Sequence, residues 1–424
     1  MSNGRTADVA GWRAGMMLPV ARLRQLAAIL GPGLVVMLAD TDAGSVITAA
    51  QSGAQWGYRL LLLQLLIIPL LFVVQELTVR LALCTGKGYG ELVRARFGRT
   101  LAWCSMLTLG VSCFGALATE MSGLAGVGQL YGVPVWLSML LVGGLIFFMV
   151  CTGSYRSVER VAILFGVFEL AFLLVAWHAR PDYHQMAAQL RHMPLANHDY
   201  LYLLAANLGT SIMPWTVFYQ QSALLDKGLT LGDLRAARLD TLLGAVLCQV
   251  ITAAVLVAAA AAFGSHGGGM RLDDIPQIAQ AFTSVLGEHV GRMLFAMALG
   301  GGALVATIVV CLSVAWALGE VTGRHHSLEL HPREAPWFYS AFGLMLLAGG
   351  VLVASGINLV RLSIATGVVN AVLLPVTLGF LFWLARHELP PQHRLRGGRA
   401  VVIGVIFMFA AGVGLYAGLA GALG

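Results

Sequence analysis

Long apolar segments recur along nearly the whole chain, and they constrain its fold more than any other feature. A helix needs about 20 apolar residues to cross a bilayer, and backbone groups at that depth must be satisfied within helices or closed barrels. Hydrophobic residues make up 58% of the chain and charged residues 11%, whereas soluble domains carry roughly 25% charge. The sequence therefore predicts an all-α membrane protein with about 11 transmembrane helices. We place them near residues 26–54, 57–83, 101–130, 134–152, 158–178, 200–225, 236–263, 290–319, 336–355, 358–385 and 399–423.

Arginine and lysine residues are distributed unevenly between the loops of this arrangement. Short cytoplasmic loops carry an excess of them, and with eleven spans the rich loops all fall on one side. We therefore expect the N-terminus to be cytoplasmic and the C-terminus extracytoplasmic, and the compact chain favours a bacterial inner membrane. Residues 1–25 would form a cytoplasmic tail and residues 26–424 a single transmembrane domain in the lipid bilayer. The basic residues of the rich loops are Lys87, Arg94, Arg96, Arg99, Arg156, Arg160, Lys227, Arg235, Arg238, Arg324, Arg333, Arg386, Arg394, Arg396 and Arg399.

Other features of the composition argue against several classes of protein. The net charge of +6 includes no dense basic run with interleaved aromatic residues, so nucleic acid is not an expected partner. No Ser/His/acid set, phosphate-binding loop or His-rich motif indicates an enzyme, and nothing predicts a cofactor or an obligate protein partner. The cysteines lie in or beside apolar spans at irregular spacing, which is typical of small core residues. They are Cys84, Cys104, Cys113, Cys151, Cys248 and Cys311.

The first span carries two carboxylates where a lipid-facing helix would be uncharged. Asp40 and Asp42 lie in "LADTDAGSVITAA", residues 38–50. A charge at the centre of a membrane helix costs about 2.5–3.5 kcal/mol on insertion scales, and non-helical backbone at that depth is tolerated only inside protein or along a cavity. We therefore predict a non-helical stretch from Asp40 to Ser45. Residues 31–33, which read Gly-Pro-Gly, weaken the helix of the same span further.

A similar interruption occurs in the sixth span, within "AANLGTSIMPWTVFYQQS", residues 205–222. Pro214 removes a backbone donor and clashes with the preceding turn, while Gly209, Thr210 and Ser211 weaken the same region. The two broken spans are five apart, the offset expected of an inverted repeat whose binding site lies between two discontinuous helices. Together with the carboxylates, this spacing predicts a transporter of cations.

Five segments, in the same order along the chain, resemble one family of divalent-metal transporters, the Nramp family. "GPGLVVMLADTDAGSVITAAQSGAQWGYRLL" at 31–61 resembles the family's first span, which carries an Asp-Pro-Gly-Asn signature. "SIMPWTVFYQQS" at 211–222 resembles its Met-Pro-His-Asn segment in span six. The other three segments are "TGKGYGELVRARFG" at 85–98, "YRSVERVAILFG" at 155–166 and "RLDTLLGAV" at 238–246.

This resemblance implies a LeuT-like fold, a 5+5 inverted repeat plus one helix, with a divalent metal bound between broken helices 1 and 6. By position, Asp42 corresponds to the family's metal-binding aspartate and Met213 to its metal-binding methionine. A backbone carbonyl near Ala39 or Gly209 would complete the set of ligands. Ser45 stands where the family has asparagine.

The chain departs from the family pattern at the positions associated with proton handling. Histidine is the natural side chain for proton exchange near neutral pH, but Trp215 and Gln220 occupy the positions of the two histidines in span six. Ala43 replaces the family proline, and Asp40 is an additional carboxylate. This pattern is similar to the branch called Nramp-related magnesium transporters, so the resemblance implies metal transport without the usual proton relay.

The candidate ligands differ in chemical hardness, which bears on the identity of the ion. Asp42 supplies a hard oxygen suited to Mg²⁺ or Mn²⁺, or else it caps the second half-helix. Asp40 either faces the same cavity and holds a hydrated ion through water or pairs with a polar group of the scaffold. Ser45 either widens the cavity for a partly hydrated ion or is only a helix-entry hydroxyl. Met213 is a soft ligand that favours Mn²⁺, Fe²⁺ or Cd²⁺, unless it only packs in the core.

Further carboxylates lie in apolar spans, where ionisable groups are rare and usually functional. Glu120 is a candidate to line the ion path. We expect Glu76 and Glu169 to make scaffold hydrogen bonds or to pair with basic residues such as Arg80. We expect Asp240 to order the cytoplasmic start of span seven.

The sequence thus predicts an importer of Mg²⁺ that also accepts Mn²⁺, without obligatory proton coupling. One alternative is a proton-coupled Mn²⁺/Fe²⁺ importer of the same family, in which Asp40 or Glu120 carries the proton. Another is a sodium-coupled small-molecule transporter of the same fold. Met213 and Pro214 disfavour that second alternative because they suit a metal better than an organic amine.

Overall fold

Every regular element in the described part of the chain is a helix, as predicted. Nine helical stretches of the described chain, some of which join consecutive helices, are long and apolar enough to cross a membrane, and the bent pair of the first span makes ten. The remaining predicted segment forms a shorter apolar helix, Val135–Val150. The expected cytoplasmic tail lies outside the described residues. The structure, a computed structural model, describes residues 31–151, 155–263, 269–324, 327–328 and 330–423.

The first half of the chain contains the first five predicted spans. The first span is a bent pair of helices, and the fifth is divided by a 3₁₀ segment, η1. The third span belongs to a longer helix that is kinked at Gly98, whose φ of 82° is a conformation that glycine adopts readily. The elements are α2 (Pro32–Asp40), α3 (Ala43–Trp56), α4 (Leu61–Thr85), α5 (Tyr89–Leu130), α6 (Val135–Val150), α7 (Tyr155–Gly166), η1 (Val167–Leu170), α8 (Ala171–His178) and α9 (Tyr183–Gln189).

The second half begins with the other broken span, α10 followed by α11, and ends with a helical hairpin, α16 and α17. Between them, α13 packs its apolar face against the protein with Ile275, Ile278 and Phe282 buried. The elements are α10 (His198–Ser211), α11 (Pro214–Asp226), η2 (Leu231–Asp233), α12 (Leu234–Phe263), α13 (Ile275–Leu286), α14 (Glu288–Thr322), α15 (Pro336–Ala354), α16 (Leu359–His387) and α17 (Gly397–Leu423).

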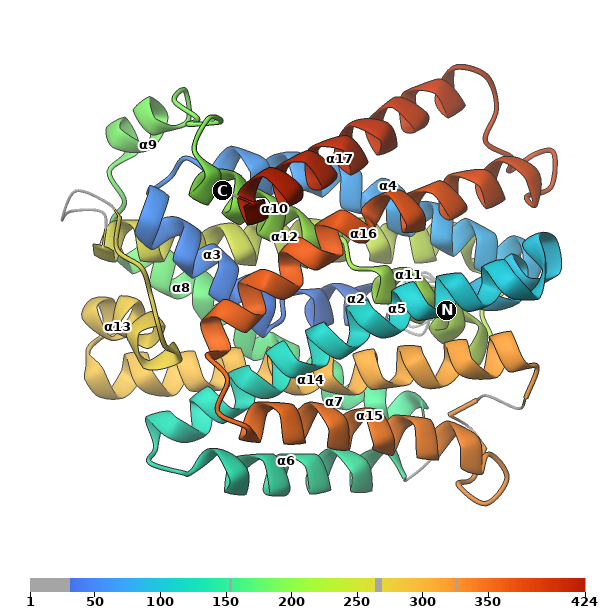
Figure 1. Cartoon of the computed structure of the whole chain (residues 1–424), viewed down its shortest axis with the longest axis horizontal. Helices are drawn as coiled ribbons and strands as arrows, with labels where there is room; N and C mark the ends of the chain where they lie inside the picture. The colour runs from blue at the N-terminus through green and yellow to red at the C-terminus, as the bar shows by residue number, and fades with distance from the viewer. Residues whose placement is uncertain (1–30, 152–154, 264–268, 325–326, 329, 424) are drawn as a thin grey trace, which may run out of the picture.

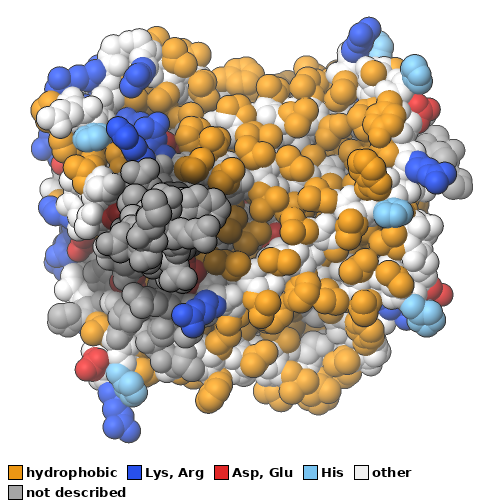
Figure 2. Space-filling view, turned by 180° about the vertical axis from the view of Figure 1, so that it is seen from behind, with side chains coloured by type: hydrophobic (Ala, Val, Ile, Leu, Met, Phe, Trp, Pro, Cys, Tyr) orange, Lys and Arg blue, Asp and Glu red, His pale blue; other side chains and the backbone are white. Residues whose placement is uncertain are grey.

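The long helices run from one end of the molecule to the other, so their connections gather at two ends. The connections α4–α5, α14–α15 and α16–α17 lie together at one end, and α9 and α13 lie at the opposite end (Figure 1). Figure 2 shows a broad band of hydrophobic side chains between the two ends, with Lys and Arg denser at the end on its left. Three of the loops predicted to be rich in arginine and lysine therefore lie at the same end.

The break in the first span is narrower than predicted. Helix α2 ends at Asp40 and α3 begins at Ala43, with an angle of 45° between them. The predicted break is therefore confirmed, but it does not extend from Asp40 to Ser45: only Thr41 and Asp42 lie outside the two helices. The helix resumes early because Asp42 caps it: Oδ1 of Asp42 accepts a hydrogen bond from the Ser45 N–H at 2.6 Å.

The break in the sixth span lies at the predicted proline. Helix α10 continues through Gly209 to Ser211, and Pro214 opens α11 at a position where a missing N–H costs little. Only Ile212 and Met213 lie between the two helices. The proline therefore ends one half-helix and starts the next, and the interruption expected from the sequence is confirmed.

A carboxylate from the seventh span holds the start of the first. Oδ2 of Asp240 accepts hydrogen bonds from the N–H groups of Gly31 at 3.1 Å and Gly33 at 2.8 Å. A Cβ on Gly33 would lie only 2.8 Å from that oxygen, so glycine permits the close approach. Asp240 was expected to order the start of its own span; it orders the N-terminus of α2 instead, where a negative charge is favourable.

Candidate metal-binding site

The two broken helices meet at Ser45, and we call the region formed by the two breaks, Thr41–Asp42 and Ile212–Met213, and the residues next to them the junction. The Ser45 hydroxyl donates a hydrogen bond to the carbonyl oxygen of Asp40 at 2.8 Å, and it lies 3.3 Å from the carbonyl oxygen of Thr210. Within an α-helix the Thr210 carbonyl would accept from residue 214, but Pro214 has no N–H to donate. The Ser45 side chain thus contacts one backbone carbonyl at each break. The two breaks therefore lie side by side in the protein interior.

Asp42 lies at the centre of this junction and is buried. Its role as the cap of α3 uses Oδ1, which accepts from the Ser45 N–H, and leaves Oδ2 outside that bond. The capping role and a role as metal ligand are therefore compatible, because each needs a different oxygen of the same carboxylate.

Glu120 on α5 frees a second backbone carbonyl at this junction. Its Oε2 accepts a hydrogen bond from the Ala43 N–H at 3.0 Å. In a continuous helix that N–H would donate to the Ala39 carbonyl, four residues earlier. The Ala39 carbonyl oxygen therefore does not accept the helical hydrogen bond from Ala43. Glu120 itself contacts the first residue of α3.

Met213 is the last residue before α11 and is buried. Its sulfur accepts a hydrogen bond from the indole Nε1–H of Trp215 at 3.2 Å. A thioether sulfur has two lone pairs, and this bond engages one of them. Trp215, which replaces a family histidine, therefore acts directly on the candidate soft ligand.

Gly209 lies where α10 packs tightly against α16. A Cβ at this position would collide with the Gly367 carbonyl and would lie 2.5 Å from the Ala371 N, so only glycine fits. In the same turn of α16, the fully buried amide of Asn370 has no hydrogen-bond partner for either polar atom among the described residues. Asn370 is thus a buried polar group close to Gly209.

The Asp40 carboxylate contacts the seventh span. Asp40 closes α2, and its Oδ2 lies 3.7 Å from the Cys248 sulfur on α12. Its Oδ1 is buried and has no hydrogen-bond partner in the described chain. Of the two interpretations of Asp40, the structure favours contact with a polar group of the scaffold, while its backbone carbonyl belongs to the junction through Ser45.

Glu169 was expected to make scaffold hydrogen bonds or to pair with a basic residue, and that expectation is wrong. Glu169 lies in η1, fully buried, and neither oxygen has a hydrogen-bond partner in the part of the chain that the structure describes. A Cβ on Gly302 would lie 2.8 Å from the Thr41 carbonyl oxygen and 3.1 Å from Glu169 Oε1, so Glu169 faces the first break. Its sequence signal, an acid in an apolar span, was the same as that of Glu120.

Glu76 behaves as predicted and lies outside the junction. It pairs with Arg80 at 2.6 Å and with Arg238 at 3.0 Å. Gln220, in the position of the second family histidine, donates from Nε2 to the Thr241 hydroxyl at 2.9 Å and so ties α11 to α12. Both side chains therefore stabilise contacts between helices.

The junction differs from a typical metal centre built from side chains. Among the described residues no group of three or more His, Cys, Asp or Glu is placed to hold a metal ion. What the junction offers is one carboxylate oxygen, freed backbone carbonyls and a thioether. Carbonyls freed at discontinuous helices are the ligands expected at a transport site.

Comparison with known proteins identifies the family. The family described as "Natural resistance-associated macrophage protein-like" (Nramp) matches residues 33–420. "Divalent metal cation transporter MntH" of Brucella suis biovar 1 (strain 1330) is 28% identical over 305 residues, covering 69% of this chain and 67% of that protein. The protein of the same name from Burkholderia ambifaria is 24% identical over 410 residues, covering 92% and 88%.

Solved structures support the same conclusion at the level of the fold. The Eremococcus coleocola manganese transporter aligns with a TM-score of 0.74 at 18% identity, over 100% of this chain and 90% of that one. MHP1, a nucleobase-cation-symport-1 family transporter, aligns with a TM-score of 0.61 at 14% identity, over 93% and 91%. The chain has the LeuT-like fold predicted from its paired broken helices, and it belongs to the Nramp family.

Proposed function

We propose that this protein imports divalent metal ions, Mg²⁺ and also Mn²⁺, without obligatory proton coupling. Its multi-pass fold and its family identify it as a membrane transporter and not an enzyme. The relatives' names specify divalent metal cations, and one structural neighbour is a manganese transporter. We further propose that it lies in a bacterial inner membrane, with the N-terminus in the cytoplasm.

The observation that carries this proposal is the hydroxyl of Ser45 between the Asp40 and Thr210 carbonyls. It puts a carboxylate, Asp42, beside carbonyls released from both broken helices. We propose that the ion is held by Asp42 Oδ2, the Ala39 carbonyl, a carbonyl at Gly209 or Thr210, and the Met213 sulfur. Ser45 would coordinate the ion through its hydroxyl oxygen. Asp40 would not coordinate the ion, and only the negative charge of its carboxylate would attract it.

The balance of hard and soft donors supports acceptance of Mg²⁺. Oxygen ligands suit Mg²⁺ and Mn²⁺, whereas a thioether favours softer metals. Because the Trp215 N–H engages one lone pair of the Met213 sulfur, the soft donor is weakened relative to the carboxylate and carbonyls. Ser45 is also shorter than the family asparagine, which leaves room for a water ligand that Mg²⁺ gives up reluctantly.

The residues at the family's histidine positions support uncoupled transport. The Trp215 indole and the Gln220 amide do not ionise near neutral pH, and each is engaged, with the Met213 sulfur or the Thr241 hydroxyl. A negative-inside potential alone favours entry by about 2.3 kcal/mol per charge per 100 mV. For a divalent ion this is about twice that amount, which is sufficient to drive accumulation.

A second candidate function, proton-coupled Mn²⁺ import, is favoured by the position of Glu120. This buried carboxylate binds the N–H of Ala43, the residue after Asp42. A proton could therefore move between Glu120 and solvent as the metal binds and leaves. The two functions predict different proton movements, so one experiment separates them.

The test uses purified protein in liposomes at a clamped negative-inside potential, without sodium on either side. Uptake of Mg²⁺ and Mn²⁺ is recorded together with the fluorescence of an internal pH dye, and Asp42→Asn liposomes serve as the matched control. We expect both ions to enter without acidification. Entry of Mn²⁺ with protons and exclusion of Mg²⁺ would establish the second candidate function. Absence of uptake of either ion until sodium is added would contradict both.

A further inference from the structure

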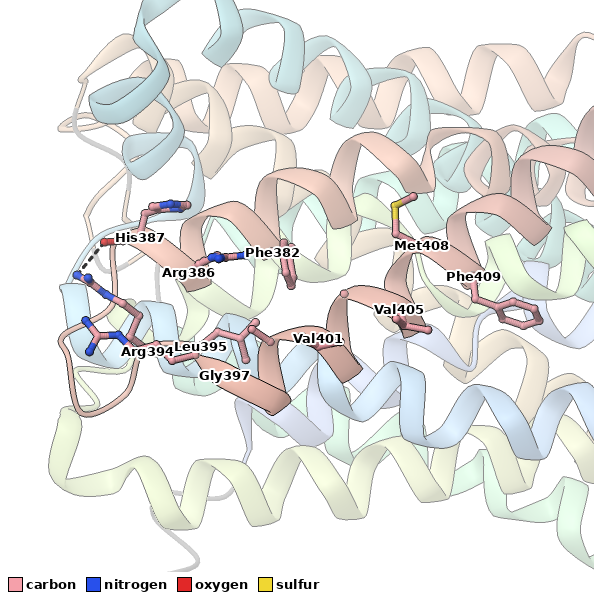
Figure 3. Close-up of a pocket in the computed structure, with 13 residues that line it drawn as sticks. Phe382, Arg386, His387, Arg394, Leu395, Gly397, Val401, Val405, Met408 and Phe409 are labelled. Atoms are coloured by element: carbon pink, nitrogen blue, oxygen red, sulfur yellow. Dashed lines mark hydrogen bonds between the residues drawn. The ribbon is translucent and has the colours of Figure 1, made fainter.

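A cleft lies between the end of α16 and the start of α17, far from the metal junction. It has a volume of about 1010 Å³ and lies at the end of the molecule where the loops are rich in arginine. Figure 3 shows Arg386 lying between the two helices, with Val401 and Val405 projecting from α17 along the same cleft. The cleft is thus basic at one end and apolar along its length.

The basic end contains three arginines, Arg386, Arg394 and Arg396, and none of the described lining residues is acidic. Neither Arg386 nor Arg396 forms an ion pair among the residues that the structure describes. Several other basic residues at this end do, as Arg96 does with Glu388 at 3.3 Å. The cleft therefore holds an uncompensated positive charge.

The loop that carries these arginines is held in place. Arg394 donates from Nε to the Leu389 carbonyl at 3.0 Å and from Nη2 to the His387 carbonyl at 3.1 Å. Arg80 on α4 donates to the His393 carbonyl of the same loop at 3.0 Å. The guanidinium groups are thus presented from a fixed backbone, which lowers the entropic cost of binding an anion.

The other wall of the cleft is made of apolar side chains that no other element covers. Val401, Val405, Met408 and Phe409 on α17 are between 63% and 76% exposed. In a membrane these side chains contact acyl chains, so a molecule in the cleft meets arginines at one end and hydrocarbon along the rest. At the mouth, a Cβ on Gly397 or Gly398 would meet nothing within 4 Å, so the entrance is open.

We propose that this cleft binds an anionic phospholipid, with its phosphate at Arg386, Arg394 and Arg396 and an acyl chain along α17. Arginine forms strong, often bidentate hydrogen bonds with phosphate, and basic pockets at the ends of transmembrane helices bind anionic head groups. A free phosphate ion shares the head-group chemistry, but it would leave the apolar wall without a partner. The combination of the two walls identifies a lipid as the occupant.

The test is native mass spectrometry of the purified full-length protein, titrated in detergent with phosphatidylglycerol or phosphatidylcholine. We expect phosphatidylglycerol to bind more tightly, and Arg386→Gln/Arg396→Gln to weaken it roughly tenfold or more. Arg399→Gln is the matched control, because Arg399 is exposed on the same helix but does not line the cleft. Equal binding of the two lipids, or unchanged binding by the double variant, would overturn the proposal.

A second pair of variants tests the apolar wall. Val401→Ser/Val405→Ser should weaken phosphatidylglycerol severalfold, whereas Val402→Ser/Ile406→Ser, which changes exposed residues outside the cleft, should not. Glycerol phosphate, which has the head-group charge but no acyl chain, should fail to displace the lipid. Displacement at comparable concentrations would identify a soluble-anion site and contradict the lipid assignment.

Discussion

The two broken helices meet at one junction, but carboxylates organise only the first of them in the described chain. Asp42 caps α3, Glu120 accepts from the Ala43 N–H, and Asp240 holds the start of α2. The sixth span is broken by Pro214, and the residue that precedes α11, Met213, makes no side-chain cap. Its sulfur instead accepts a hydrogen bond from Trp215.

This difference separates attraction of a cation from discrimination between cations. A helix N-terminus carries about half a positive charge, so bare half-helix starts at the junction would repel a metal ion. The carboxylates offset that charge at the first break, whereas the second break contributes neutral donors of different hardness. We therefore expect loss of the Asp42 charge at the first break to abolish binding of all divalent ions, and changes to the neutral donor side chains of the sixth span to alter only which ions bind.

The largest expected effect comes from removing the charge of Asp42 without removing its cap. Asn is as good an N-cap as Asp, so Asp42→Asn should keep the stability of the wild type and still lose Mg²⁺ and Mn²⁺ uptake by roughly 100-fold or more, about 3 kcal/mol. Asp42→Ala should lose uptake equally and also lower the free energy of unfolding by about 1 kcal/mol. Uptake in liposomes and reversible unfolding in detergent measure the two effects. Wild-type uptake by Asp42→Asn would show that the residue is only a cap.

A smaller, selective effect is expected in the sixth span. Met213→Leu removes the sulfur and nearly conserves volume, so Mn²⁺ and Cd²⁺ affinity should fall roughly tenfold while Mg²⁺ is little changed. Trp215→Phe removes the N–H that engages the sulfur, and it should raise Cd²⁺ affinity about two- to tenfold. Isothermal titration with each metal measures both variants. If Met213→Leu weakened Mg²⁺ and Cd²⁺ equally, the sulfur would not be a source of selectivity.

The sequence predicted the architecture because its signals are local and strong. Continuous apolar runs specify the spans. Pro214 lacks the N–H of a helical bond and follows Gly209, Thr210 and Ser211, which weaken the same turn, so the second break could be located to within two residues. The first break was predicted to be longer than it is, because Asp40 and Ser45 were both assigned to the break and both lie in helices. The cap formed by Asp42 lets α3 start at Ala43, and a helix start depends on that single hydrogen bond.

The partners of the buried carboxylates could not be predicted, because they depend on contacts between distant spans. Asp40 is the last residue of a helix, and the helical phase directs its side chain to Cys248 on α12. Asp240 binds backbone N–H groups more than 200 residues away. Glu169 has the same local sequence context as an ordinary scaffold acid, and only the packing of η1 against α14 turns it toward the first break.

The smallest expected effect concerns Ser45, which connects the two breaks. Ser45→Ala removes the bond to the Asp40 carbonyl and the contact with the Thr210 carbonyl, so the free energy of unfolding should fall by about 0.5–1.5 kcal/mol. The KM for Mg²⁺ should rise about two- to fivefold, because the two half-helices are held together less tightly. Ser122→Ala is the control: its hydroxyl is equally buried, but it bonds within α5 to Ala118. A rise in KM of the same size in that control would mean that the Ser45 link between the breaks has no special role, and the distinction between attraction and discrimination would then rest on Asp42 and Met213 alone.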